Sequence, residues 1–128
     1  MLVADGADII DWAVGDAVIN LYMRDFFVWP PLADLGMGLR AGAENGLLTE
    51  YTVLPAKRLV RAPKSLSMSE AATIPCAAHT AWTALTKLSQ ARPGDTVLSL
   101  GTGGVALFAL ALCQKLGIKG NRYDKSGR

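Results

Sequence analysis

The stretch from Thr96 to Leu116 constrains the fold of this chain more than any other part of its sequence. It begins with a short apolar run, Thr96–Leu100, which follows the turn sequence Arg92-Pro-Gly-Asp95. It continues through Gly101-Thr-Gly-Gly104 into a long apolar segment that ends before Gly117. This pattern predicts a buried strand, a glycine turn and a buried helix with a glycine at its C-terminal cap. Both elements are stable only where other apolar groups surround them.

The glycine turn has the composition of a phosphate-binding loop. Gly101 permits the sharp turn from strand to helix, and Gly103 leaves the backbone bare so that a pyrophosphate can approach. Ala106 stands where a third glycine often lets helix and strand pack closely. The free amides of Gly103, Gly104 and Val105 would point at the phosphates from the positive end of the helix. A glycine-rich turn without a ligand stays the alternative.

Dinucleotide-binding folds also place an acidic residue about twenty positions after the turn, at the end of a second strand. By count Asp124 falls close to that place. The preceding run, Ile118–Tyr123, is a poor sequence for the middle of a parallel sheet, so we interpret the position of Asp124 as a coincidence. The choice between NAD and NADP therefore stays undecided at this point.

The N-terminal half of the chain predicts β structure. Short strands are expected at four runs, 7–12, 16–21, 48–54 and 58–61. A tight turn is expected at Ala13-Val-Gly-Asp16. Residues 22–46 lack periodicity and predict a long irregular loop.

Helical signals follow in the middle of the chain. Ser67 and Glu70 have the S-x-x-E spacing of a capping box, in which each side chain accepts from the other residue's amide. Pro75 should break or restart this helix, and alanine, tryptophan and leucine continue at helical spacing from Cys76 to Leu88. The chain therefore reads as β in its first half and as α followed by α/β in its second.

Composition and charge argue against several classes of protein. The 128 residues, 51% of them hydrophobic, are enough for one ordinary core and too few for a two-domain enzyme of usual size. A net charge of +2 with scattered basic residues argues against a nucleic-acid partner. The uncharged stretch Val97–Leu112 approaches a membrane span in length, but its glycines favour a buried strand and helix. Cys76 and Cys113 show no CxxC pairing, and no signal peptide precedes them, so we expect a cytoplasmic protein.

Six short motifs resemble, in order and spacing, those of the medium-chain dehydrogenase/reductases, and most closely the zinc-type alcohol dehydrogenase and quinone oxidoreductase branch. They are Val14-Gly-Asp16, Gly46–Tyr51, Ser69–Cys76, Thr80-Ala-Trp82, Pro93-Gly-Asp95 and Gly101–Val105. The resemblance implies a mixed α/β chain that begins inside one domain and stops inside another. Residues 1–66 would be the C-terminal part of a GroES-like substrate domain. Residues 67–128 would be connecting helices and the first βα unit of a Rossmann NAD(P)-binding domain.

The same resemblance implies an oxidoreductase that passes hydride between NAD or NADP and an alcohol, a carbonyl or a conjugated enone or quinone. The family's nucleotide turn falls on Gly101, Gly103, Gly104 and Val105, and its threonine beside the nicotinamide falls on Thr80. The implied partners are a small-molecule substrate and, in a complete parent, further copies of the chain, with neither nucleic acid nor membrane. The catalytic residues are unknown. The alternative is an inactive chain that binds cofactor or another protein, and we expect these residues alone to be inactive.

Cys76 stands where the zinc-dependent members of this family have a catalytic zinc ligand. A catalytic zinc needs three protein ligands, so Cys76 alone makes no metal site, and zinc in a complete parent stays open. We interpret Cys76 as a buried thiol, His79 as an ordinary helix residue and Cys113 as part of the core. The tail after Gly117 departs from the family pattern, so the strand Thr96–Leu100 is expected to lack a neighbour within the chain.

Overall fold

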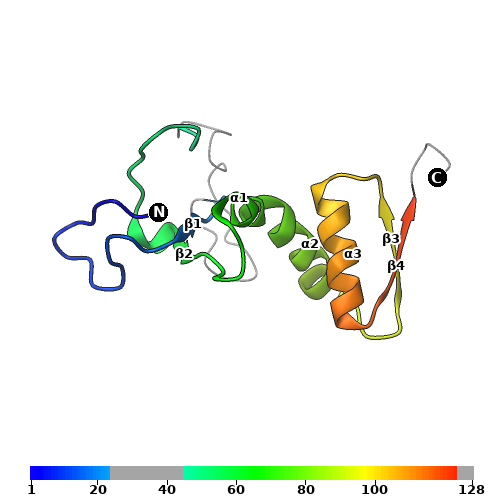
Figure 1. Ribbon diagram of the computed structural model, residues 1–128. Helices are drawn as coiled ribbons and strands as arrows, with labels where there is room; N and C mark the ends of the chain where they lie inside the picture. The colour runs from blue at the N-terminus through cyan, green and yellow to red at the C-terminus, as the bar shows by residue number, and fades with distance from the viewer. Residues whose placement is uncertain (24–44, 124–128) are drawn as a thin grey trace. The chain divides into compact units, whose positions relative to one another are not determined.

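The computed structural model describes residues 1–23 and 45–123 of the chain. Helices and strands are mixed along it, and it divides into two compact units, Met1–Ala72 and Thr73–Arg128 (Figure 1). Most of the irregular loop expected at 22–46 lies outside the described residues, and so does Asp124.

Among the described residues of the first unit, two strands form an antiparallel pair. Strand β1 (Val18–Asn20) pairs with β2 (Leu59–Arg61), with Ile19 opposite Val60. A 3-10 turn, η1 (Ala56–Arg58), leads into β2. These strands confirm two of the predicted runs, at 16–21 and 58–61.

Arg61 joins β2 to the N-terminal segment. Its Nη1 donates to Asp16 Oδ2 at 3.0 Å, and its Nη2 donates to the carbonyl oxygen of Asp11 at 2.9 Å. Asp16 Oδ2 also accepts from the N–H of Ala13 at 3.0 Å, which confirms the tight turn predicted there. The bond from Ala13, together with Arg61, lowers the pKa of Asp16.

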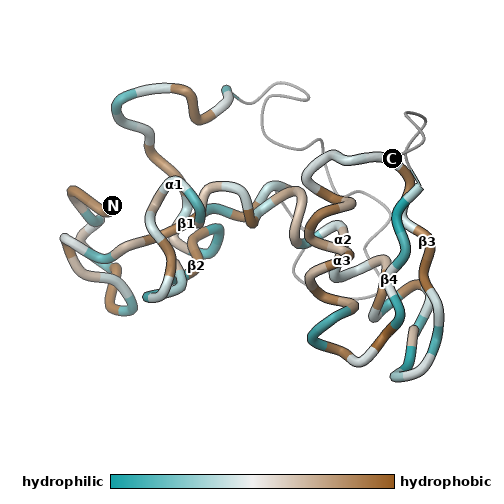
Figure 2. The backbone as a smooth tube through the Cα atoms, turned by 45° about the vertical axis from the view of Figure 1, so that its right-hand side comes forward, coloured by the Kyte–Doolittle hydropathy of each residue, from teal (hydrophilic) through white to brown (hydrophobic). Residues whose placement is uncertain are grey.

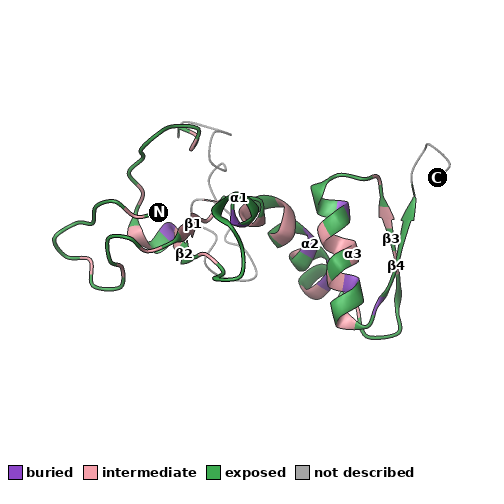
Figure 3. Ribbon diagram, in the orientation of Figure 1, coloured by how far each residue is buried: buried purple, intermediate pink, exposed green. Residues whose placement is uncertain are grey.

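The strands predicted at 7–12 and 48–54 are wrong, because both runs are irregular. Leu48 and Val53 are 95% and 97% exposed, and much of this unit is exposed (Figure 3). An alternating run becomes a strand only where a neighbour supplies hydrogen bonds. No described strand pairs with either run.

The capping box is formed as predicted and begins α1 (Met68–Ala71). Ser67 Oγ accepts from the N–H of Glu70 at 3.3 Å, and Glu70 Oε2 accepts from the N–H of Ser67 at 2.8 Å. Two of the first amides of the helix region, which have no acceptor within the helix, are thereby satisfied.

The second unit begins with a continuous helical stretch. Its three segments are η2 (Ile74–Ala78), α2 (His79–Thr83) and η3 (Ala84–Leu88), of which η2 and η3 have the wider π-type hydrogen bonding. Pro75 lies in the first turn of η2, so the predicted restart of the helix at this proline is confirmed. A proline is tolerated there because its missing N–H would have no helical partner.

The glycine-rich sequence forms a β–α–β unit. Strand β3 (Thr96–Leu100) is followed by α3 (Gly104–Leu116), and Gly117, at a φ of 68°, caps the helix in the left-handed conformation. The chain then returns as β4 (Lys119–Tyr123). The strand, the helix and its glycine cap were all predicted, and Figure 2 shows the apolar residues of β3 and α3 in brown.

Strand β4 overturns the expectation that β3 lacks a neighbour within the chain. It runs parallel to β3 over all five residues, with Val97 opposite Gly120. A Cβ added at Gly120 would lie 2.9 Å from Leu110 Cδ2 and 3.2 Å from Cys113 Cβ, so α3 lies almost on the β4 backbone. The residues of β4 have low β propensity, which predicts a poor strand. Packing against α3 overrides this propensity.

The core of the second unit lies around Cys113. This residue is fully buried, as predicted, and packs with Leu85 and Ile118, which are 4% and 5% exposed. Burial raises the pKa of the Cys113 thiol. Val97 packs against this cluster, whereas Leu98, on the opposite face of β3, is 62% exposed.

We predict that Gly120→Val destabilises the second unit by about 1–3 kcal/mol, because the added side chain overlaps atoms of α3. Hydrogen exchange of the α3 amides in rising urea would measure the change. Gly103→Ala is the matched control, since its φ is −75° and an added Cβ meets nothing within 4 Å. Equal exchange in the Gly120 variant and the wild type would contradict the close approach of helix and strand.

The capping box also predicts a pH dependence of α1. Bonds from the side chain and the backbone of Ser67 lower the pKa of Glu70. Because the folded carboxyl binds its proton less tightly than the unfolded one, the cap stabilises α1 above the unfolded pKa and is lost as pH falls through the folded pKa. Ser67→Ala should therefore raise the pKa of Glu70 toward its ordinary value.

An NMR titration of the Glu70 carboxyl carbon through the acid range would test this prediction. Ser69→Ala is the control, because Ser69 lies in the same helix and outside the box. Identical Glu70 titrations in the wild type and the Ser67 variant would show that the box does not act on this carboxyl.

Candidate functional site

The glycine turn lies where β3 ends and α3 begins, and its first two glycines have different roles. Gly101 has a φ of 85°, a conformation that side chains disfavour, so the backbone itself requires this glycine. Gly103, the N-cap of α3, has an ordinary φ of −75°, and an added Cβ would meet nothing within 4 Å. The protein alone does not require a glycine at Gly103, and bare backbone there leaves room for a ligand.

The first turn of α3 presents backbone amides. Its earliest backbone bond runs from the N–H of Leu107 to the carbonyl oxygen of Gly103 at 3.1 Å. The amides of Gly104 and Val105, which precede it, have no acceptor within the helix. No acidic residue lies in this turn, and the dipole of a thirteen-residue helix makes this end partly positive. The turn is therefore suited to an anion.

Gly104 has a second role that the sequence analysis missed. A Cβ added to it would lie 3.4 Å from the Cβ of Ala77, so the glycine lets η2 pack against the beginning of α3. No local signal distinguishes this packing role from phosphate binding. Ala106, at the position of the fingerprint's third glycine, is buried.

The end of β4 lies beside the turn. The N–H of Gly101 donates to the carbonyl oxygen of Tyr123 at 2.8 Å, and Leu100 is opposite Tyr123 in the sheet. The second strand of a dinucleotide-binding fold ends at this place, and the residue after it contacts the adenosine ribose. Asp124 follows Tyr123 in the sequence. It was set aside because the preceding run is a poor sequence for a parallel strand, and β4 removes that reason.

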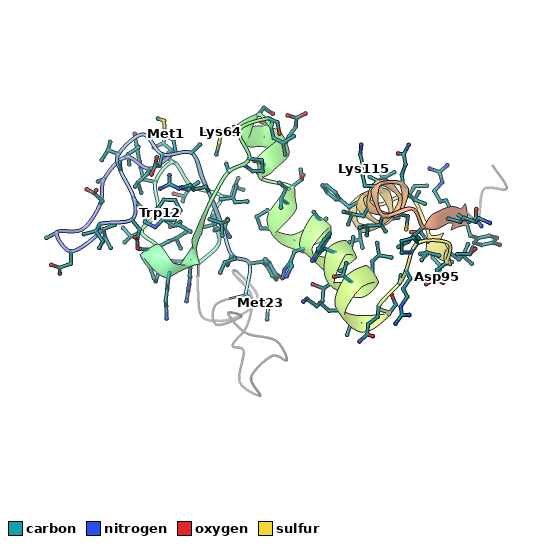
Figure 4. All side chains as sticks on the ribbon, turned by 90° about the horizontal axis from the view of Figure 1, so that it is seen from below. Met1, Trp12, Met23, Lys64, Asp95 and Lys115 are labelled. Carbon is teal, nitrogen blue, oxygen red and sulfur yellow. The ribbon has the colours of Figure 1, made fainter. Side chains whose placement is uncertain are left out.

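The turn before β3 marks the opposite end of the sheet. Asp95 Oδ2 accepts from the N–H of Arg92 at 2.7 Å, and Gly94 has a φ of 94°. Figure 4 labels Asp95 there, and Lys115 near the end of α3. The predicted turn is confirmed, and it lies away from the glycine turn.

Thr80 and Cys76 lie on the helical stretch and are both exposed. The expectation of a buried Cys76 thiol is therefore wrong. The buried face of this stretch is formed by Ala81 and Leu85, which are one turn apart, and Cys76 lies off that face. His79, the first residue of α2, is exposed as well.

The described residues do not fit a catalytic zinc. Cys76 and His79 supply two side chains of the kind that bind zinc, and a catalytic site needs three. In residues 1–23 and 45–123, no three or more His, Cys, Asp or Glu side chains are grouped to hold a metal ion.

None of the helices in the described part of the chain has the length and apolar character needed to cross a membrane. The uncharged stretch Val97–Leu112 is a strand, a turn and most of a helix.

No protein-family model matches the chain. Among curated proteins, it is 43% identical over 107 residues to a zinc-type alcohol dehydrogenase-like protein of Schizosaccharomyces pombe, a match that covers 82% of this chain and 31% of that protein. It is also 37% identical over 92 residues to the polyketide synthase GfsB of Streptomyces halstedii, covering 70% of this chain and 2% of the synthase.

Solved structures give a consistent result. A protein of Sinorhizobium meliloti 1021 that is assigned as an alcohol dehydrogenase matches with a TM-score of 0.83 and 38% identity, over 93% of this chain and 36% of its own. An NAD-dependent alcohol dehydrogenase matches with a TM-score of 0.82 and 28% identity, over 97% of this chain and 39% of its own. The CurK enoyl reductase, at 22% identity and a TM-score of 0.52, shares the fold.

The chain spans about a third of the length of its alcohol dehydrogenase-like relatives. The matches nevertheless cover most of the chain, and the solved structures include both of its units. The sequence identities and the parallel β–α–β unit agree with the family resemblance of the six sequence motifs. The chain belongs to the medium-chain dehydrogenase/reductases, a family of oxidoreductases, and to their alcohol dehydrogenase-like members.

Proposed function

We propose that this chain carries the cofactor-binding turn of an NAD(P)(H)-dependent oxidoreductase that acts on an alcohol, a carbonyl or a conjugated enone or quinone. The space beside Gly103, next to the amides of Gly104 and Val105, is the observation that carries the proposal. The likeness to an NAD-dependent alcohol dehydrogenase supports it.

In this proposal the two parts of the chain, which contain different kinds of sheet, have different roles. Residues 1–66, with the antiparallel pair β1–β2, belong to a GroES-like substrate domain, and residues 67–128, with the parallel pair β3–β4, begin a Rossmann domain. Gly101, Gly103, Gly104 and Val105 hold the pyrophosphate, and Thr80 lies beside the nicotinamide. When bound, the nicotinamide supplies the hydride chemistry, and the protein's part is to bind and orient it.

The setting we propose is the cytoplasm, since Cys76 and Cys113 are both free thiols. The partners are a small-molecule substrate and, in a complete parent, further copies of the chain.

An inactive chain that binds cofactor or another protein is the second candidate. It is favoured by exposed apolar side chains in the first unit, such as Ile10 at 94% and Val53 at 97%. Nicotinamide absorbance, followed with alcohol and enone substrates, measures hydride transfer by the purified chain. We expect none from these 128 residues alone, and steady turnover would contradict the second candidate.

Gly103→Val should lower the affinity for NAD(P)H by about tenfold or more, because the branched side chain fills the place of the pyrophosphate. Titration of cofactor fluorescence measures the affinity. The fold should be unaffected, since nothing lies within 4 Å of the added Cβ. Gly6→Val is the control in the first unit, where a Cβ meets only Ile9, at 3.7 Å. Unchanged affinity in the Gly103 variant would remove the turn from the site.

Zinc should not bind to this chain at one ion per chain, because Cys76 and His79 supply too few ligands. Dialysis against buffered zinc followed by atomic absorption measures the bound metal, and Cys76→Ser should leave it unchanged. A chain that holds one zinc and loses it in the Cys76 variant would contradict this prediction.

A further inference from the structure

The charges on α3 and β4 bear on which nicotinamide cofactor the proposed site takes. These two elements carry three cations, Lys115, Lys119 and Arg122, and no acidic residue. Every residue of β4 is exposed (Figure 3). The charged side chains of these two elements are therefore all positive, and those of β4 are accessible to an anion.

The two cations of β4 lie at opposite ends of the strand. Lys119 begins it, opposite Thr96, and Arg122 is its penultimate residue, opposite Ser99. At the rise of a β-strand their Cα atoms are about 10 Å apart. Arg122 is the cation at the glycine-turn end, because the next residue, Tyr123, accepts from the N–H of Gly101 at 2.8 Å.

Arg122 also lies on the face of the sheet that α3 covers. Side chains alternate along a strand, so Arg122 shares a face with Gly120, where an added Cβ would contact Leu110 and Cys113. Because α3 runs back along the strands, Arg122 lies closer than Gly120 to the beginning of the helix. The amides proposed to hold the pyrophosphate are at that beginning.

We propose that the chain binds NADP(H) in preference to NAD(H), and that the Arg122 guanidinium pairs with the 2′-phosphate of the adenosine ribose. This inference rests on the proposed function. The ribose lies at the end of the second strand in dinucleotide-binding folds, and a nearby arginine accommodates its 2′-phosphate. A planar guanidinium matches phosphate oxygens with two parallel hydrogen bonds, which a lysine does not do.

The opposing group is the carboxylate of Asp124, which follows β4 in the sequence and would favour the free ribose hydroxyls of NAD(H). Of the three cations of α3 and β4, Arg122 is the one at the glycine-turn end of the sheet, so the preference that we propose depends on its guanidinium.

Titration of the full chain with NADP⁺ and NAD⁺, which differ only in the 2′-phosphate, tests the inference. Saturation-transfer NMR detects even weak binding of either cofactor. We expect NADP⁺ to bind at least about tenfold more tightly, and Arg122→Gln to remove about tenfold of its affinity while leaving that of NAD⁺ unchanged. Lys119→Gln, which removes the same charge at the far end of the strand, should change neither affinity by more than about twofold.

Each failure of this experiment has its own meaning. Binding of neither cofactor would contradict the proposed function and the inference together. Equal binding of both, or tighter binding of NAD⁺, would overturn the inference and leave the proposed function intact. An equal loss of both cofactors in the Arg122 variant would also overturn it, because contact with the shared pyrophosphate produces that result and contact with the 2′-phosphate does not.

Discussion

The contact between α3 and β4 at Gly120 is the constraint on which the second unit depends. Leu110 and Cys113 lie so close to the strand backbone that a side chain at this position would overlap them. The contact keeps β4 against β3 for five residues, although the β4 sequence has little preference for a strand. The pairing then brings the carbonyl oxygen of Tyr123 to the N–H of Gly101. Helix packing in the middle of the unit thus determines the geometry of the candidate site at its end.

Elements whose signals are local were predictable from the sequence. The box between Ser67 and Glu70, and the left-handed cap at Gly117, depend on atoms within a few residues of each other, so spacing and residue type are sufficient. Strand β4 was not predictable because its determinant, the bare backbone at Gly120, matters only once α3 lies on it. The prediction of a strand at 48–54 was wrong for the opposite reason, because its alternation is regular but no described strand pairs with it.

The candidate site divides in the same way. The order of strand, turn and helix located Gly101 and Gly103 from spacing alone, and the cofactor roles of Gly103 and Thr80 stay predictions. The packing of Gly104 on Ala77 was missed because the two residues are brought together by the fold and not by the sequence. The exposure of Cys76 was missed for a related reason. Packing against α3 determines which side of the helical stretch is buried, and this packing cannot be read from the local sequence.

The contrast between the two thiols turns the chain into its own folding indicator. Cys76 is exposed to solvent, whereas Cys113 lies on the buried side of α3, against β4, and its raised pKa favours the unreactive thiol form. An alkylating reagent therefore counts one sulfur in the intact second unit and two once α3 leaves the sheet. The residue that packs against the Gly120 backbone is thus also the one whose labelling reports that this packing has been lost.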